Sequence, residues 1–244
     1  MKPHICILGA NSDIARALAH QYARTGYSLY LAARQSQRLL EDVQDLKIRY
    51  QAEARIVEFD ATDYDSHADF YASLNPQPDV VACVFGYLGE QAQAQQDWTE
   101  ARRILDTNYT GAASILHHVA HAMEQRGSGT IIGISSVAGD RGRASNYLYG
   151  SAKAGFTAFL SGLRNRLAAS GVHVLTVKPG FVQTAMTEGL DLPPLLTAQP
   201  EEVARDVFRA EKRKKNVVYT QWMWRYIMWV IRNIPEGIFK RMKL

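Results

Sequence analysis

Cysteine is scarce in this chain of 244 residues, which contains two, Cys6 and Cys83, each inside an apolar segment. Two such residues provide no disulfide framework, so we expect buried free thiols. The first residues lead directly into a short apolar segment and a glycine, without the length or cleavage pattern of a signal peptide. These features predict a cytoplasmic protein in a reducing compartment.

Long apolar runs are also missing. The most apolar stretch, residues 222–231, is shorter than the ~20 residues that cross a bilayer. The net charge of +4 is uneven, because residues 205–244 hold 11 Lys and Arg against 3 Asp and Glu. This asymmetry predicts a basic tail that meets an anionic surface, and we expect no nucleic-acid partner.

The remaining chain has ordinary globular composition, with 47% hydrophobic and 21% charged residues. Short apolar segments alternate with stretches of helical periodicity, and they lie at residues 4–8, 28–33, 55–59, 79–85, 130–134, 172–177 and 217–219. This alternation predicts a doubly wound α/β fold of the Rossmann type, with a parallel sheet of about seven strands in a single domain. We expect a dinucleotide-binding catalytic domain over residues 1–220 and a C-terminal tail over residues 221–244.

The most informative stretch follows the fifth apolar segment, which ends in Ser135 and Ser136. A helical stretch then carries Tyr149 and Lys153 on one face, one turn apart. A nearby ammonium lowers the pKa of a phenol, so this tyrosine could exchange a proton near neutral pH. A bare Tyr–Lys pair is more often a surface feature, and its position after the serine strand is what favours a catalytic site.

The serine pair, the intervening loop and the Tyr-Gly-Ser-Ala-Lys run at 149–153 resemble the short-chain dehydrogenase/reductase family. The family's spacing selects Ser136 and Tyr149 over their neighbours Ser135 and Tyr147. The resemblance implies reduction of a carbonyl by a nicotinamide cofactor, with Ser136 and Tyr149 holding the oxygen and Tyr149 donating the proton. Lys153 would bind the nicotinamide ribose, and Asn108 would bend its helix and hold a water near Lys153. The resemblance also implies a homo-oligomer.

The glycine turn departs from the family's pattern. Gly9 remains, but Asp13 and Ala15 stand where two further glycines belong. A carboxylate near a phosphate is unfavourable, so we expect Asp13 either to point away or to cap the following helix. No acidic residue ends the second strand, and Arg34 stands there instead. A guanidinium suits a 2′-phosphate, which favours NADPH, with NADH possible.

By the same resemblance, Asp60 would hold the adenine amino group, although it could instead cap the next helix. The family's Asn-Asn-Ala-Gly motif is replaced by residues 83–86, of which Gly86 alone is kept. The predicted cofactor-binding residues are Gly9, Asn11, Ser12, Asp13, Ile14, Arg34, Asp60, Gly86, Tyr149, Lys153, Pro179, Gly180, Val182 and Thr184. Residues 185–197 would cover the substrate.

Histidines supply no convincing ligand set. His117 and His121 could share a helix face, but no carboxylate partner is evident, so we predict no metal site.

The tail combines three tryptophans with arginines, a composition that suits a membrane interface. With the altered glycine turn and residues 85–89, it resembles the branch of reductases that convert decaprenylphosphoryl 2-keto-pentofuranose to its arabinose epimer. The substrate would then be a lipid-linked ketone and the protein peripheral at the inner face of the membrane. Two alternatives stay open: a reductase of a soluble or acyl ketone whose tail packs at a dimer contact, and a non-catalytic dinucleotide sensor.

Overall fold

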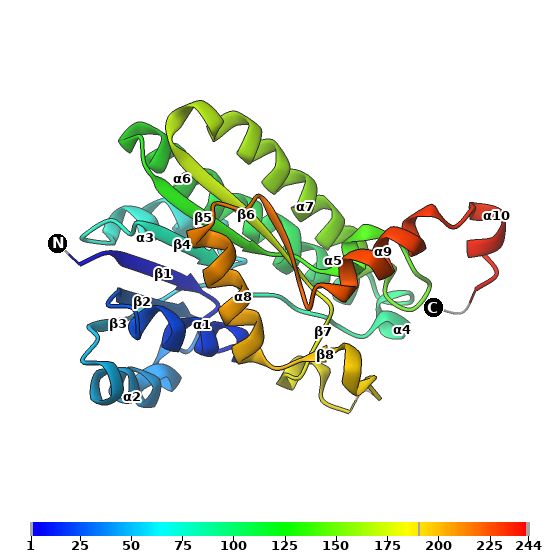
Figure 1. Cartoon of the computed structure of the whole chain (residues 1–244), viewed down its shortest axis with the longest axis horizontal. Coiled ribbons are helices and arrows are strands. Elements are labelled where there is room, and N and C mark those ends of the chain that lie inside the picture. Colours follow the sequence, from blue (N-terminus) through cyan, green and yellow to red (C-terminus); the bar gives the residue numbers. More distant parts are fainter. Residues whose placement is uncertain (1, 190, 243–244) are drawn as a thin grey trace.

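The computed structural model describes residues 2–189 and 191–242, so residue 190 of the predicted covering loop and residues 243–244 of the tail lie outside the described residues. One parallel sheet has the strand order β3-β2-β1-β4-β5-β6-β9 (Figure 1). Its strands are β1 (His4–Leu8), β2 (Ser28–Ala33), β3 (Ala54–Glu58), β4 (Val80–Cys83), β5 (Gly129–Ile134), β6 (Val172–Pro179) and β9 (Val217–Thr220). The predicted doubly wound sheet of about seven strands is confirmed.

Helices cover both faces of this sheet (Figure 1). One layer consists of α1 (Asp13–Ala23), α2 (Leu40–Tyr50) and α8 (Pro200–Lys212). The other consists of α3 (His67–Ser73), α6 (Gly111–Arg126) and α7 (Tyr147–Leu167). The five inner strands are buried on both sides, which explains why they are largely apolar rather than alternating, whereas the edge strands β3 and β9 are partly exposed. Cys6 and Cys83 are buried free thiols, as predicted.

The strand order reverses between β1 and β4, which both pair with parallel neighbours. In open α/β sheets the ligand crevice lies outside the carboxyl ends of the strands at this point. The glycine turn after β1, the loop after β4 and the serines after β5 all come to this edge. The fold therefore brings together segments that are far apart in the sequence.

The helical segment that carries Asn108 is divided. It consists of α5 (Trp98–Leu105), a π-helical turn (Asp106–Thr110) and α6. Asn108 lies inside the π-helical turn and is buried. Isolated π turns are frequent at functional sites. The local bend that the resemblance assigned to Asn108 is therefore present.

Three short elements follow β6 before α8. Strand β7 (Phe181–Val182) pairs with β8 (Thr197–Ala198) in a small second sheet. Between them lie two short 3₁₀ turns (Ala185–Thr187 and Pro194–Leu196).

The C-terminal tail forms α9 (Met223–Asn233) and α10 (Glu236–Phe239), separated at Pro235. It projects from the edge of the domain (Figure 1). Within the described residues, no helix has both the length and the apolar character needed to cross a bilayer.

Candidate active site

The glycine turn closes tightly on the loop after β4. Gly9 has φ 88°, and a Cβ there would lie 2.6 Å from the backbone nitrogen of Phe85. Glycine is therefore required by both conformation and space. Ser12 caps α1 by accepting a hydrogen bond from the Ala15 N–H at 3.3 Å. The turn thus leaves the start of α1 facing the crevice, where helix N-termini bind phosphate groups.

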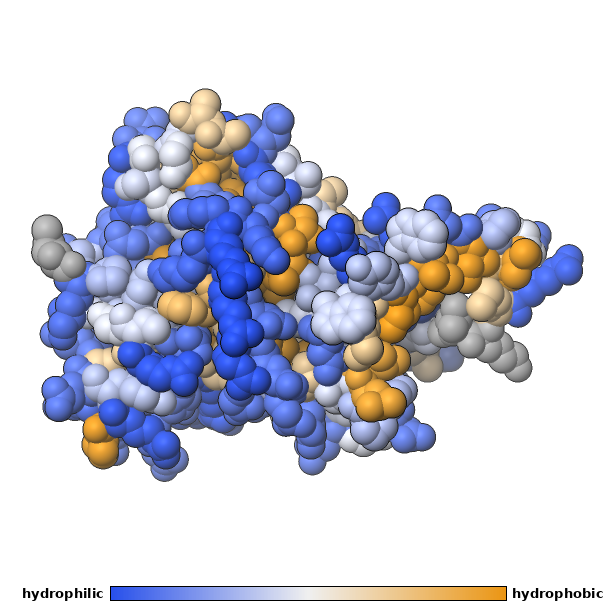
Figure 2. Space-filling view, in the orientation of Figure 1, coloured by the Kyte–Doolittle hydropathy of each residue, from blue (hydrophilic) through white to orange (hydrophobic). Residues whose placement is uncertain are grey.

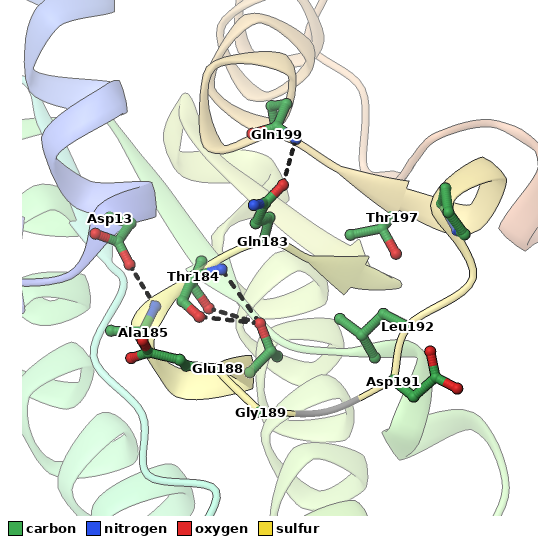
Figure 3. Close-up of a pocket in the computed structure, with 12 residues that line it drawn as sticks. Asp13, Gln183, Thr184, Ala185, Glu188, Gly189, Asp191, Leu192, Thr197 and Gln199 are labelled. Carbon is green, nitrogen blue, oxygen red and sulfur yellow. Dashed lines mark hydrogen bonds between the residues drawn. The ribbon is translucent and has the colours of Figure 1, made fainter.

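Asp13 does not cap α1, since Ser12 holds that place. Its carboxylate instead accepts a hydrogen bond from the Ala185 N–H at 2.8 Å, across the crevice (Figure 3). Of the two expected roles, the capping role is wrong and the carboxylate is directed away from its own helix. The pair joins the glycine turn to the segment after β7. Beside it lies a pocket of about 800 Å³, lined by Asp13 and by residues of the segments 183–189 and 191–199 (Figure 3).

Arg34, which is predicted to bind the 2′-phosphate of NADPH, follows the end of β2 and is exposed. Its carbonyl accepts a hydrogen bond from Asn11 Nδ2 at 2.9 Å, which ties the glycine turn to this strand. Glu58, at the end of β3, accepts from the N–H groups of Gln35 and Ser36 at 2.9 and 3.0 Å. Sequence analysis missed this role of Glu58, because the carboxylate orders a loop that is more than 20 residues away in the chain.

Asp60 accepts hydrogen bonds from the N–H and hydroxyl of Thr62, both at 2.8 Å. It forms a local turn rather than a cap for α3. Burial raises the pKa of Asp60, but the bonds from Thr62 and the charge of Arg34 outweigh it, so the pKa lies below its ordinary value. Asp60 is therefore a carboxylate beside Arg34, and its contact with adenine stays a prediction.

Ser136 and Tyr149 come together at the carboxyl end of β5, where the serine hydroxyl lies close enough to lower the pKa of the tyrosine. Ser136 Oγ also accepts from the Ala138 N–H at 3.1 Å, which fixes the rotamer of the serine. Ser135, in contrast, is buried against α7 and bonds to Thr157 and the Lys153 carbonyl. The choice of Ser136 over Ser135 agrees with this geometry.

Lys153 is 3% exposed, and its Nζ donates to the carbonyl of Ile134 at 3.0 Å. The ammonium lies 5.7 Å from the ring centroid of Tyr149. Burial lowers the pKa of Lys153 to about 8, against a small opposing effect of Cys83. Burial likewise raises the pKa of Tyr149 to about 12, against the opposing effect of the Ser136 hydrogen bond.

The expected lowering of the Tyr149 pKa by Lys153 is therefore not present in this structure. The physical reason is that desolvation disfavours the charged forms of both groups, and the ammonium is directed at Ile134 rather than at the phenol oxygen. In this state Tyr149 is a protonated acid, which is the form that a carbonyl reduction requires.

Asn108 holds the loop that follows β4. Its Nδ2 donates to the carbonyls of Tyr87 and Ile104 at 2.6 and 2.8 Å, and its Oδ1 accepts from the Tyr87 N–H at 3.2 Å. A Cβ at Gly86 would lie 3.0 Å from Asn108 Oδ1 and 3.5 Å from Lys153 Nζ. Gly86 thus lets the loop pass between these side chains. The asparagine side chain stabilises the loop that lacks the family's own asparagines, and its role toward a water stays a prediction.

The Pro179–Gly180 turn is covered by the tail. A Cβ at Gly180 would lie 1.9 Å from Trp224 Nε1, and this nitrogen donates to the carbonyl of Leu196 at 3.2 Å. Farther on, the carbonyl of Val182 accepts from Thr187 Oγ1 at 2.6 Å. The Thr184 N–H also donates to Thr187 Oγ1, at 3.2 Å. The contacts of Val182 and Thr184 with a nicotinamide stay predictions.

One face of α9 is part of the domain. Trp224 and Met228 are 4% and 0% exposed and share an apolar cluster with Val137, the residue after Ser136. Arg141 holds the end of the helix, because it donates to the carbonyls of Ile231 and Ile234 at 3.1 and 2.7 Å. The packing face of the tail therefore forms one wall of the region around Ser136.

The opposite face of α9, together with α10, is exposed to solvent in the described structure. Its exposed apolar side chains are Trp222, Tyr226, Trp229, Val230, Ile238 and Met242. Figure 2 shows orange and pale residues running along the projecting segment. The basic residues Arg225, Arg232, Lys240 and Arg241 are exposed around them. We call this set the exposed tail face. One face of the tail packs against the domain, and the other leaves apolar and basic side chains exposed. Neither the membrane-interface interpretation nor the packing interpretation therefore describes the whole tail.

Comparisons with known proteins identify the family. The family model for short chain dehydrogenase matches residues 3–193. An uncharacterised oxidoreductase of Mycobacterium tuberculosis is 38% identical over 241 residues, covering 98% of this chain and 96% of the relative. An uncharacterised oxidoreductase of Streptomyces coelicolor is 36% identical, covering 98% and 95%. Among solved structures, a short-chain dehydrogenase from Sphingobium yanoikuyae in complex with NADPH has a TM-score of 0.83 at 22% identity, covering 96% and 97%.

The chain belongs to the short-chain dehydrogenase family. It is an oxidoreductase of that class, and the catalytic roles of Ser136, Tyr149 and Lys153 stay predictions.

Proposed function

We propose that this protein is an NADPH-dependent carbonyl reductase. The observation that carries the proposal is that Ser136 lies close enough to Tyr149 to act on its pKa, beside the buried Lys153. The residues present fit a dinucleotide, because Gly9 lets the turn pass close beside Phe85 and the Ala185 N–H holds the Asp13 carboxylate. When bound, NADPH supplies a hydride.

The chain's own residues do the proton chemistry. The hydroxyls of Ser136 and Tyr149 hold the carbonyl oxygen, and the neutral Tyr149 donates its proton to the developing alkoxide. The ammonium of Lys153 stabilises the phenolate that remains. Asn108 supports this site through the loop at Tyr87, which it holds at both the N–H and the carbonyl.

Changing Tyr149→Phe removes the proton donor and keeps the ring. Turnover of a ketone should fall about 10²- to 10⁴-fold, while NADPH binding measured by its fluorescence stays close to wild type. Tyr147→Phe is the matched control, since Tyr147 is 43% exposed and one half-turn away on the same helix. Undiminished turnover in Tyr149→Phe would remove Tyr149 from the role of acid.

We infer that the substrate is a lipid-linked keto sugar that the enzyme meets at a membrane surface. The exposed tail face supports this, because aromatic side chains beside basic residues bind the headgroup region of a bilayer. The mycobacterial and Streptomyces relatives align with 98% of the chain, so the match includes nearly all of this tail. The homo-oligomer stays a separate prediction.

Sedimentation with vesicles tests the membrane contact. Wild-type protein should sediment with phosphatidylglycerol vesicles more than with phosphatidylcholine vesicles, and Trp229→Ala should weaken both. Trp98→Ala is the matched control, because Trp98 and Trp229 are each 67% exposed and Trp98 lies on α5, away from the tail. Equal sedimentation of all three proteins would contradict a membrane-binding tail.

A substrate panel tests the ketone. It contains a detergent-dispersed polyprenyl-phosphoryl keto-pentose and several water-soluble ketones, with NADPH consumption as the readout. Selective turnover of the lipid-linked sugar is expected. Turnover of water-soluble ketones alone would keep the reductase and remove the lipid-linked substrate.

A further inference from the structure

Arg143 is a partly buried cation in the loop between Ser136 and Tyr149. Its Nε is buried and makes no hydrogen bond, and its Nη2 lies 3.5 Å from the thioether sulfur of Met228. A thioether is a weak acceptor for a guanidinium, which has five donors to satisfy. Burial lowers the pKa of Arg143, against the opposing charge of Asp140. The side chain thus carries a charge that its surroundings stabilise poorly.

The acidic residue beside this guanidinium is engaged elsewhere. The carboxylate of Asp140 accepts from Lys178 Nζ at 2.5 Å and from the Tyr219 hydroxyl at 2.7 Å. Arg141 provides a contrast, because it bonds to the end of α9 and to Glu236 at 2.7 Å. Arg141 therefore has a structural role, whereas the described structure gives Arg143 no comparable set of acceptors.

The position of Arg143 links it to the reacting groups. Met228, which it contacts, packs in one cluster with Val137, the neighbour of Ser136. The carbonyl of Arg143 accepts from the Asn146 N–H at 3.2 Å, and the Asn146 carbonyl accepts from the Gly150 N–H at 2.8 Å, next to Tyr149. The guanidinium thus lies under α9, between the serine loop and the start of the tyrosine helix.

Two further buried polar atoms in this region lack partners. Asn146 Oδ1 is an acceptor, and Gln91 Nε2 is a donor. The side-chain oxygen of Gln91 accepts a hydrogen bond from the Leu148 N–H at 3.2 Å, which positions the amide beside the start of α7. Buried polar groups are normally hydrogen-bonded, so these two atoms need partners that the described residues do not supply, such as ligand atoms or waters.

We propose that Arg143 binds an anionic group of the ketone substrate, with a phosphate ester as its class, while Gln91 and Asn146 bind hydroxyl groups of the same molecule. This inference rests on the proposed reductase function and deepens it. A planar guanidinium matches two phosphate oxygens at once. Because Arg143 lies under α9, the phosphate would be held where the packed face of the tail meets the catalytic site. A lipid attached to that phosphate would extend toward the exposed tail face.

Binding of prenyl probes tests the proposal without turnover. The NADPH-loaded protein is titrated with farnesyl phosphate and with farnesol in detergent, and tryptophan fluorescence reports binding beside Trp224. Wild-type protein should bind the phosphate at least about tenfold more tightly than the alcohol, and Arg143→Gln should remove this difference. Arg143→Lys should keep part of it, because the charge remains. Inorganic phosphate should compete with farnesyl phosphate in the wild type but not in Arg143→Gln.

Matched variants keep the result interpretable. Arg213→Gln removes an exposed arginine far from the site and should bind both probes as the wild type does. Tyr149→Phe should keep the phosphate preference although its turnover is lost, so failure of the reductase proposal and failure of the Arg143 proposal are distinguishable. An unchanged preference in Arg143→Gln would overturn the inference. Loss of binding of Arg143→Gln to phosphatidylglycerol vesicles, with the probe preference intact, would assign Arg143 to lipid headgroups and overturn it also.

Discussion

Trp224 occupies the space that a side chain at Gly180 would need, with 1.9 Å between the indole nitrogen and a Cβ built at the glycine. The contact joins the tail to the Pro-Gly turn after β6. It also places the indole beside Phe181, at a ring-centroid separation of 5.2 Å. The glycine of the family's turn therefore has a second role in this chain, which is to receive the C-terminal helix.

Replacing this tryptophan should destabilise the fold. Trp224→Ala leaves a cavity among buried side chains and should lower the free energy of unfolding by about 3–5 kcal/mol in urea titrations. Trp229→Ala, on the opposite face of the same helix, should change it by less than about 0.5 kcal/mol. Similar losses in both variants would mean that α9 does not pack as described.

Arg34 should decide between the two nicotinamide cofactors. Arg34→Ala removes the guanidinium at the end of β2 and should raise KM for NADPH at least about tenfold, because hydrogen bonds to charged groups contribute about 1.5–3 kcal/mol. KM for NADH should change little, since that cofactor lacks the 2′-phosphate. Arg38→Ala, in the 3₁₀ turn Ser36–Leu39 that follows, serves as the comparison. A parallel rise for both cofactors would contradict a 2′-phosphate site.

The buried ammonium of Lys153 predicts a pH dependence of stability. Its pKa is about 8 in the folded protein and 10.5 ordinarily, so between these values the unfolded chain binds more protons. Stability therefore rises with pH in this window, and the cost of the buried charge is greatest below pH 8. The full effect is at most about 3 kcal/mol, at about 1.4 kcal/mol for each pKa unit.

Comparison with Lys153→Met isolates this effect. The methionine variant has no charge to bury, so its free energy of unfolding should exceed that of the wild type most at pH 7 and least at pH 9.5. Urea unfolding at both values provides the measurement. The high pKa of Tyr149 acts above pH 10 and does not enter this range. A constant difference between the two proteins would show that Lys153 keeps its ordinary pKa.

The sheet and the proximity of Ser136, Tyr149 and Lys153 could be predicted from the sequence, because both follow from residues that are close together along the chain. Ser136 ends a strand, and Tyr149 and Lys153 follow on one helix, so their proximity is nearly fixed once the strand and helix form. Trp224 against Gly180 could not be predicted in this way, because the contact depends on the path of the chain between them. Arg143 was missed for a related reason, since a basic residue in a loop is informative only when its acceptors are known to be missing.

Asp13, which stands where the family's motif has a glycine, makes a contact with a distant segment of the chain. Sequence reasoning offered a helix cap, but Ser12 already fills that position and the carboxylate bonds to Ala185. Asp13→Asn keeps an oxygen that can accept this bond and removes the negative charge. KM for NADPH should then fall about fivefold, which corresponds to about 1 kcal/mol of repulsion between a carboxylate and the cofactor phosphates.

Asp13→Ala separates the bond from the charge. Like Asp13→Asn, this variant removes the negative charge near the phosphates. It also removes the acceptor for the Ala185 N–H, so the segment that begins at Ala185 is released. Limited proteolysis within residues 184–189 should therefore be faster than in the wild type or in Asp13→Asn. If Asp13→Ala and Asp13→Asn are cleaved at the same rate, the bond to Ala185 does not hold the segment. If neither changes KM for NADPH, the carboxylate lies too far from the phosphates to matter, and its place in the glycine turn serves the loop alone.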